Sequence, residues 1–135
     1  MTASYLLDTN VLSELVRKKP APGVVQRLGE LPPERVATSC ICAMELRYGA
    51  ARHPEGQRLW DRIKQDVLTR IRVLALTEAD ALRAGELLAG LADRGTPIGI
   101  EDVLIAATAL GNDLVVVTRN VKHYSRIPGL RVEAW

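Results

Sequence analysis

The apolar residues of the chain form short runs that alternate with longer stretches of helical periodicity. The short runs predict five strands, at residues 4–7, 35–38, 73–76, 114–118 and 130–133. Apolar residues spaced three and four apart predict helices at residues 10–17, 24–31, 39–52, 55–70, 77–95 and 102–110. Strands that alternate with helices are typical of an α/β fold of three layers, in which helices cover both faces of a central, mainly parallel sheet.

The organisation of the chain predicts a single domain over residues 1–135. Neither an internal repeat nor a Gly/Ser-rich linker interrupts the sequence, and 135 residues are about the length of one domain. A hydrophobic content of 47% and a charged content of 25% exclude a disordered chain. The sequence contains neither an apolar run near the roughly 18 residues of a membrane span nor a secretory signal, so we expect a cytoplasmic protein with no membrane attachment.

The net charge and the cysteine content exclude few classes of function. The formal net charge of +2 is too small to indicate a nucleic-acid partner by itself. The two cysteines, Cys40 and Cys42, are one residue apart, and we expect both to be buried, reduced thiols. Neither they nor His53 and His123 have the spacing of a zinc site.

Three acidic residues stand out because of their places in the predicted elements. Asp8 directly follows the first strand, and Asp102 begins the apolar helix at 102–110. Each could serve its helix alone, Asp8 as an N-cap and Asp102 as a favourable charge at the helix start. Glu45 lies within an apolar stripe of the helix at 39–52, where an unpaired carboxylate is costly and an ion pair is the alternative to a functional role.

The carboxyl ends of parallel strands meet at one edge of a sheet, so these three acids can converge there. Three carboxylates held close together need a cation, and ligation by oxygen alone favours Mg²⁺, with Mn²⁺ as the alternative. Such an ion orients a phosphate and activates a bound water. A fourth element, the segment Thr118-Arg119-Asn120, follows the most apolar strand and could bind metal waters or a phosphate, although turns have the same composition.

These motifs together resemble the PIN-domain family, and within it the VapC-type toxins of toxin–antitoxin pairs. The matching stretches are YLLDTNVLSEL at 5–15, MELRYG at 44–49, PIGIEDVLIAA at 97–107 and TRN at 118–120. They occur in the family's order, and the resemblance extends over essentially the whole chain. It implies a PIN-like three-layer domain and a metal-dependent endoribonuclease of a type II system, with RNA as substrate.

The resemblance also assigns residues and partners. Asp8, Glu45 and Asp102 would be the metal-binding and catalytic acids, joined by Asn120 as a catalytic residue. Many relatives have a fourth acid at the position of His123, and this difference leaves a second metal site open. The family further implies a homodimer and a cognate VapB-type antitoxin that blocks the site and through which alone the pair contacts DNA.

Four more residues are expected to contact the substrate, namely Thr9, Asn10, Thr118 and Arg119. Basic side chains must also attract RNA toward an acidic site. The candidates are Arg47, Arg52, Arg119, Lys122 and Arg126, for each of which a solvated surface position is the alternative.

Other functions remain to be compared with the nuclease. A phosphoacceptor receiver domain needs two adjacent acids after the first strand, and a dehalogenase-type phosphatase needs an Asp at position 10, where this chain has Asn10. A PIN fold that only binds RNA or protein, with degenerate catalytic acids, is the remaining alternative. A test of Mg²⁺-dependent stabilisation separates it from the nuclease.

Overall fold

The computed structural model of the chain describes residues 4–135. Its five strands form one sheet in the order β3-β2-β1-β4-β5, and every neighbouring pair is parallel. The strands are β1 (Tyr5–Leu7), β2 (Val36–Ser39), β3 (Arg72–Leu74), β4 (Val115–Val117) and β5 (Val132–Glu133). The predicted α/β class is therefore confirmed, and the sheet is parallel throughout.

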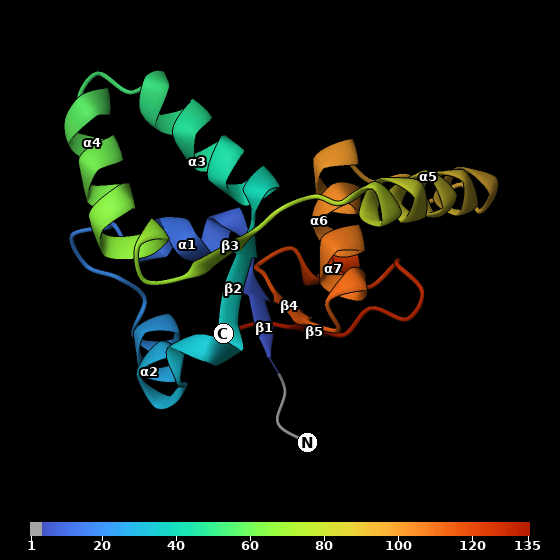
Figure 1. Cartoon of the computed structure of the whole chain (residues 1–135), viewed down its shortest axis with the longest axis horizontal. Helices are drawn as coiled ribbons and strands as arrows, with labels where there is room; N and C mark the ends of the chain where they lie inside the picture. Colours follow the sequence, from blue (N-terminus) through green and yellow to red (C-terminus); the bar gives the residue numbers. More distant parts are fainter. Residues whose placement is uncertain (1–3) are drawn as a thin grey trace.

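Seven α-helices and two short segments of other helical types connect the strands within residues 4–135. The helices are α1 (Thr9–Glu14), α2 (Pro22–Glu30), α3 (Cys40–Ala51), α4 (Gly56–Ile63), α5 (Glu78–Asp93), α6 (Ile100–Gly111) and α7 (Val121–Tyr124). The 3₁₀ turn η1 (Pro33–Arg35) precedes β2, and the π-helical turn η2 (Lys64–Leu68) continues α4. Figure 1 shows α1 to α4 on one side of the sheet and α5 to α7 on the other, which makes three layers.

The centre of the sheet is the most deeply buried part of the fold. Every residue of β1 and β4 is buried, as expected for strands that helices cover on both faces. In register, Leu6 pairs with Ala37 of β2 on one side and with Val116 of β4 on the other. The chain runs from β1 outward through β2 to β3 and then returns to β4 beside β1. The direction of connection therefore changes between β1 and β4, which is where parallel α/β sheets place their ligands.

Several predicted boundaries are wrong by a few residues. The strand expected at 73–76 is Arg72–Leu74, because the register opposite Ala37–Ser39 ends there. The strand expected at 130–133 contains only Val132 and Glu133. The first helix ends at Glu14 and not near residue 17, and the helix expected at 102–110 begins at Ile100, which puts Asp102 inside its first turn.

The helix caps follow from the local sequence. Asp8 caps α1, Ser39 caps α3 through a hydrogen bond from the Cys42 N–H, and Thr77 forms the predicted capping box with Asp80 at the start of α5.

Both cysteines are free thiols, Cys42 being buried and Cys40 partly so. Within residues 4–135, none of the helices has the length and apolarity needed to cross a bilayer.

Candidate active site

Asp8 lies where β1 ends and α1 begins, beside the point at which the sheet connections reverse. Its carboxylate is only 4% exposed and is held by two donors. The backbone N–H of Thr9 donates to Oδ1 at 2.8 Å, and the hydroxyl of Thr118 donates to Oδ2 at 2.7 Å. The predicted cap is therefore present, but a cap alone does not need a second donor from the end of β4.

Glu45 reaches the same place from the first turns of α3. Its Oε1 accepts a hydrogen bond of 2.7 Å from the Thr9 hydroxyl, so that Thr9 contacts Asp8 through its backbone and Glu45 through its side chain. One ligand atom each from Asp8, Glu45 and Cys42 lie within 4.8 Å of one another. Convergence of Asp8 and Glu45 on one site, which the sequence predicted, is thus observed directly.

The third acid, Asp102, approaches from the first turn of α6. Its Oδ1 accepts a hydrogen bond of 3.3 Å from the hydroxyl of the fully buried Tyr124, and its Oδ2 lies 4.0 Å from Nδ1 of His123. The Tyr124 hydroxyl also acts on Asp8 and lowers the pKa of that carboxyl. Tyr124 therefore links the carboxylate that follows β1 to the carboxylate of α6.

The electrostatics of the three acids are those of buried carboxylates with His123, and no Lys or Arg among the described ion pairs, as a counter-charge. Burial raises the pKa of Asp8, and the hydroxyl of Thr118, the N–H of Thr9 and the hydroxyl of Tyr124 oppose that rise. Burial is also the main cause of the raised pKa of Glu45 and of Asp102, and the negative charge of Asp8 raises both further. The ion pairs formed within residues 4–135 leave all three carboxylates without a Lys or Arg partner.

The donor set fits a hard divalent cation. Carboxylates whose pKa is raised by burial and by neighbouring negative charge are stabilised when such an ion binds between them, and their oxygens are the ligands that Mg²⁺ and Mn²⁺ prefer. Cys42 is the one non-oxygen member of the cluster. Burial raises the pKa of its thiol, which accepts a hydrogen bond from Ser39 at 3.4 Å, so the thiol stays protonated and is a poor ligand for a hard ion.

The remaining predicted site residues form a frame around these acids. Thr118 is fully buried beneath Asp8, a position that suits support of the carboxylate and not direct contact with a substrate. Its hydroxyl also accepts a hydrogen bond from the backbone N–H of Asn120 at 2.9 Å. Asn10 accepts one from the backbone N–H of Arg119 at 3.2 Å. The side chains of Arg119 and Asn120 are exposed.

The other basic candidates have structural contacts of their own. The guanidinium of Arg47 lies 4.9 Å from the ring centre of Trp60, and that of Arg52 lies 5.7 Å from the ring centre of Tyr48. Arg126 donates to the carbonyl of Pro97 at 3.2 Å. Lys122 is exposed. Arg52 lies two turns after Glu45, at the end of α3, and is the candidate for its ion pair. The ion pairs within residues 4–135 include none between the two, so this alternative for Glu45 is wrong.

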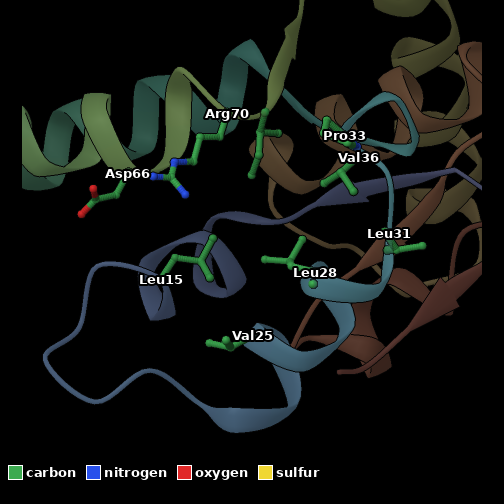
Figure 2. A pocket seen from close by; sticks show the side chains of 10 residues that line it. Leu15, Val25, Leu28, Leu31, Pro33, Val36, Asp66 and Arg70 are labelled. Carbon is green, nitrogen blue, oxygen red and sulfur yellow. The ribbon is translucent and has the colours of Figure 1, made fainter.

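A separate groove of about 500 Å³ lies between the end of α1, α2, β2 and the segment after η2 (Figure 2). Its lining is mainly apolar and includes Leu15, Leu28 and Val36, with Asp66 and Arg70 at one side. None of the three acids lines this groove. The acidic site and the apolar groove are thus two different surfaces of the molecule.

Two residues of the site are absent from the sequence-based prediction. Cys42 is not among the predicted site residues because the cysteines lack zinc spacing, yet its position one turn before Glu45 on α3 puts it on the same helix face. Tyr124 gave no signal, since a single Tyr in a four-residue helix has no periodicity to indicate which side chain points inward.

Comparison with known proteins agrees with the geometry. The family model of the PIN domain matches residues 5–130. The chain is 35% identical over 131 residues to the tRNA(fMet)-specific endonuclease VapC of Salmonella typhimurium, and 30% identical over 131 residues to the ribonuclease VapC2 of Haemophilus influenzae. Each alignment covers 97% of this chain and 97% of the relative.

Solved structures give the same result. The DNA-bound VapBC of Salmonella typhimurium superposes with a TM-score of 0.91 at 34% identity, over 99% of both chains. VapBC2 of Rickettsia felis, bound to a DNA fragment from its promoter, superposes with a TM-score of 0.89 at 28% identity, over 97% of this chain and 98% of the other. With the matched motifs, the parallel sheet and the converging acids, this chain belongs to the PIN-domain family and, within it, to the VapC proteins.

Proposed function

We propose that the protein is the ribonuclease toxin of a type II toxin–antitoxin pair, and that it hydrolyses RNA phosphodiester bonds with the help of Mg²⁺. The observation that carries this proposal is the closeness of Asp8 and Glu45, with Asp102 near enough for the charge of Asp8 to raise its pKa, and with His123 but no Lys or Arg paired to the three acids. Relatives that carry the name ribonuclease or endonuclease VapC at 30–35% identity support it.

Asp8 and Asp102 would hold the metal ion directly. Bound there, the ion would neutralise the charge of the scissile phosphate and lower the pKa of a coordinated water. Thr118 fixes one oxygen of Asp8, and Tyr124 fixes one oxygen of Asp102, so both carboxylates are oriented before any ligand arrives. Mn²⁺ would serve in place of Mg²⁺, since both prefer oxygen ligands.

Glu45 has a different role in this proposal. Thr9 occupies its Oε1, which leaves Oε2 to orient the attacking water and to accept its proton. The raised pKa of Glu45 brings its proton affinity closer to neutral pH and suits it to that task. Asn120 and the basic residues near it, Arg119 and Lys122, would bind the RNA backbone.

The partners follow from the same family. We infer a homodimer, a cognate VapB-type antitoxin that inhibits the site, and contact with DNA only through that antitoxin. The VapBC complexes of Salmonella typhimurium and Rickettsia felis, both bound to DNA, support this inference. Co-purification with the product of a neighbouring short open reading frame tests the antitoxin, and light scattering of the purified chain tests the dimer.

The decisive test is RNA cleavage by the purified protein. A mixture of cellular RNAs that includes tRNA should be cut with Mg²⁺ present and left intact with EDTA, and sequencing of the new ends would identify the target. Asp8→Ala and Asp102→Ala should each lower the rate by at least about a hundredfold, because a direct ligand is lost. Glu101→Ala, which removes the neighbouring exposed carboxylate, is the matched control and should retain most of the rate.

The same proteins distinguish the nuclease from a degenerate PIN fold that only binds RNA or protein. Mg²⁺ should raise the unfolding temperature of the wild-type protein and should raise that of Asp8→Asn much less. Equal responses of the two proteins, or full cleavage by Asp8→Ala, would exclude the proposed mechanism.

A further inference from the structure

Helix α1 carries a second buried carboxylate, which the acidic site does not use. Glu14 is 3% exposed, and its Oε2 contacts two guanidinium groups. Arg17 NH1 lies at 3.2 Å and Arg119 NH2 at 3.0 Å. Burying an unpaired carboxylate costs several kcal/mol, and one arginine would be enough to offset the charge. The second arginine, from the segment after β4, calls for an explanation beyond helix stability.

Arg119 is tied closely to the groups that hold the catalytic acids. It directly follows Thr118, whose hydroxyl supports Asp8. Its backbone N–H donates to Asn10 Oδ1 at 3.2 Å, and Asn10 directly follows Thr9, which donates to Glu45. The Arg119 backbone is therefore adjacent in sequence to Thr118, which supports Asp8. Through Asn10 it is also connected to Thr9, which supports Glu45. Glu14 fixes the side chain of the same residue.

The charge balance of this second cluster is positive. Two guanidinium groups share one carboxylate, which leaves a net charge of +1. The side chains of Arg17 and Arg119 are 64% and 50% exposed, so each guanidinium keeps nitrogens that face solvent. A guanidinium has five N–H donors in a planar fork that matches a phosphate. Arg119 can thus pair with Glu14 on one side and with an anion on the other.

We propose that Glu14 is a positioning residue, which holds the guanidinium of Arg119 beside the acidic site so that it binds a phosphate of the RNA backbone next to the scissile one. The inference rests on the proposed ribonuclease function. Arg119 would then supply the positive group that an RNA substrate needs near three carboxylates. The buried carboxylate determines where the arginine points, and the arginine makes the contact.

Glu14→Gln tests this proposal because a pure charge effect and a loss of positioning predict opposite changes in RNA affinity. Loss of a negative charge, considered alone, strengthens the binding of RNA by simple electrostatics. Loss of the positioning contact weakens it. We expect Glu14→Gln to raise the KM for RNA about three- to tenfold with little change in kcat, the range of an exposed contact to phosphate. Glu86→Gln, the same charge change at an exposed position on α5, is the control for electrostatics alone.

A double-mutant cycle shows whether Glu14 acts through Arg119. Arg119→Ala should raise KM by a similar factor and reduce the salt dependence of RNA binding by about one phosphate contact. In the Arg119→Ala background, Glu14→Gln should then add nothing. Independent, multiplying effects would overturn the proposal, and so would a Glu14→Gln protein that binds RNA as tightly as the wild type.

Two further measurements distinguish a loss of RNA binding from a folding defect and from a failure of the ribonuclease proposal. Thermal unfolding shows whether Glu14→Gln is folded. If it is not, Glu14→Asp replaces it, because this variant keeps the charge but is too short to reach both arginines. The same rise in KM is expected for Glu14→Asp. Fluorescence anisotropy with labelled RNA in EDTA measures binding without cleavage. A wild type that binds RNA but does not cut it would therefore refute the ribonuclease while still testing Glu14.

Discussion

The hydroxyl of Thr118 donates a hydrogen bond of 2.7 Å to Oδ2 of Asp8, a residue 110 positions earlier in the chain. Both residues follow central strands of the sheet, β4 and β1, which pair directly. Neighbouring parallel strands end at the same edge, so their next residues are brought together by the backbone alone. A carboxylate near the N-terminus thus takes its orientation from a hydroxyl near the C-terminus.

Loss of this hydroxyl should weaken the site more than the fold. Thr118→Val keeps the shape of the side chain but leaves Asp8 Oδ2 and the Asn120 N–H without their partner. We expect a loss of about 1–3 kcal/mol in unfolding free energy and a fall of about 10- to 100-fold in RNA cleavage or Mg²⁺ affinity. Activity assays and Mg²⁺ titrations followed by thermal unfolding measure both.

Two control variants separate the two effects. Thr118→Ser retains the hydroxyl and should retain most of the activity. Thr38→Val removes another buried hydroxyl, which donates to the Leu7 carbonyl at 2.7 Å, and should lower stability without a comparable loss of cleavage. Equal activity of Thr118→Val and wild type would show that Asp8 does not depend on this hydrogen bond.

Tyr124→Phe tests the link between two of the acids. The phenol hydroxyl donates to Asp102 at 3.3 Å and lowers the pKa of Asp8, while the ring is fully buried. Phenylalanine preserves the packing, so stability should change little, whereas Mg²⁺ affinity should fall about tenfold or more as Asp102 loses its fixed orientation. Tyr5→Phe, at a buried tyrosine of β1 outside this site, is the control. Unchanged Mg²⁺ affinity in Tyr124→Phe would remove Tyr124 from the site.

The ionisation of Asp102 should destabilise the metal-free protein. Burial and the charge of Asp8 raise the pKa of Asp102 in the folded state. Its contribution to stability is therefore fully present below the unfolded pKa of about 3.9 and is lost as the pH rises through the raised folded pKa. In EDTA, Asp102→Asn should unfold a few degrees above the wild type at neutral pH, and this advantage should disappear near pH 3.5.

Added Mg²⁺ should reverse that order at neutral pH, since only the wild type has the full set of ligands. Glu101→Gln, at the exposed neighbouring carboxylate, should shift the unfolding temperature much less than Asp102→Asn. Thermal unfolding between pH 3.5 and pH 8, with and without Mg²⁺, measures both effects. If Asp102→Asn were the less stable protein in EDTA at pH 7, the repulsion among the acids would be refuted.

Gly111 should be intolerant of any side chain. A Cβ at this last residue of α6 would collide with Oδ1 of Asp80, which is fixed in the capping box of α5, and would approach Arg83. Gly111→Ala should therefore lower the unfolding free energy by about 1–3 kcal/mol. Gly85→Ala on α5, where a Cβ meets nothing within 4 Å, should raise it by up to about 1 kcal/mol. Denaturant unfolding of the two variants gives the comparison.

Sequence patterns predicted those parts of the molecule that repeat or that lie at strand ends. The β-branched run around Val116 identified a central strand, and Asp8 and Asp102 stood out by their places at helix starts. Tyr124 and Glu14 could not be found in this way. Each acts through a partner about 20 or 100 residues away, and no local spacing indicates such a pairing.

The boundaries that were predicted wrongly have similar causes. The strand at 72–74 ends where its neighbour ends, which only the register between β2 and β3 determines. The π-helical turn after Ile63 continues the helical spacing of the apolar residues but widens the turn, as the hydrogen bond from Thr69 N–H to the Lys64 carbonyl shows. Apolar periodicity detects that such a segment is helical and cannot detect its hydrogen-bond pattern.

The pairing of β1 with β4 has a consequence for the synthesis of the protein. Tyr5–Leu7 leaves the ribosome long before Val115–Val117, the strand that completes its hydrogen bonds on one side. A nascent chain that stops short of residue 118 has Asp8 and Glu45 but lacks the Thr118 hydroxyl that holds Oδ2 of Asp8. The proposed acidic site is therefore complete only once the segment around residue 118 has been synthesised and paired with β1.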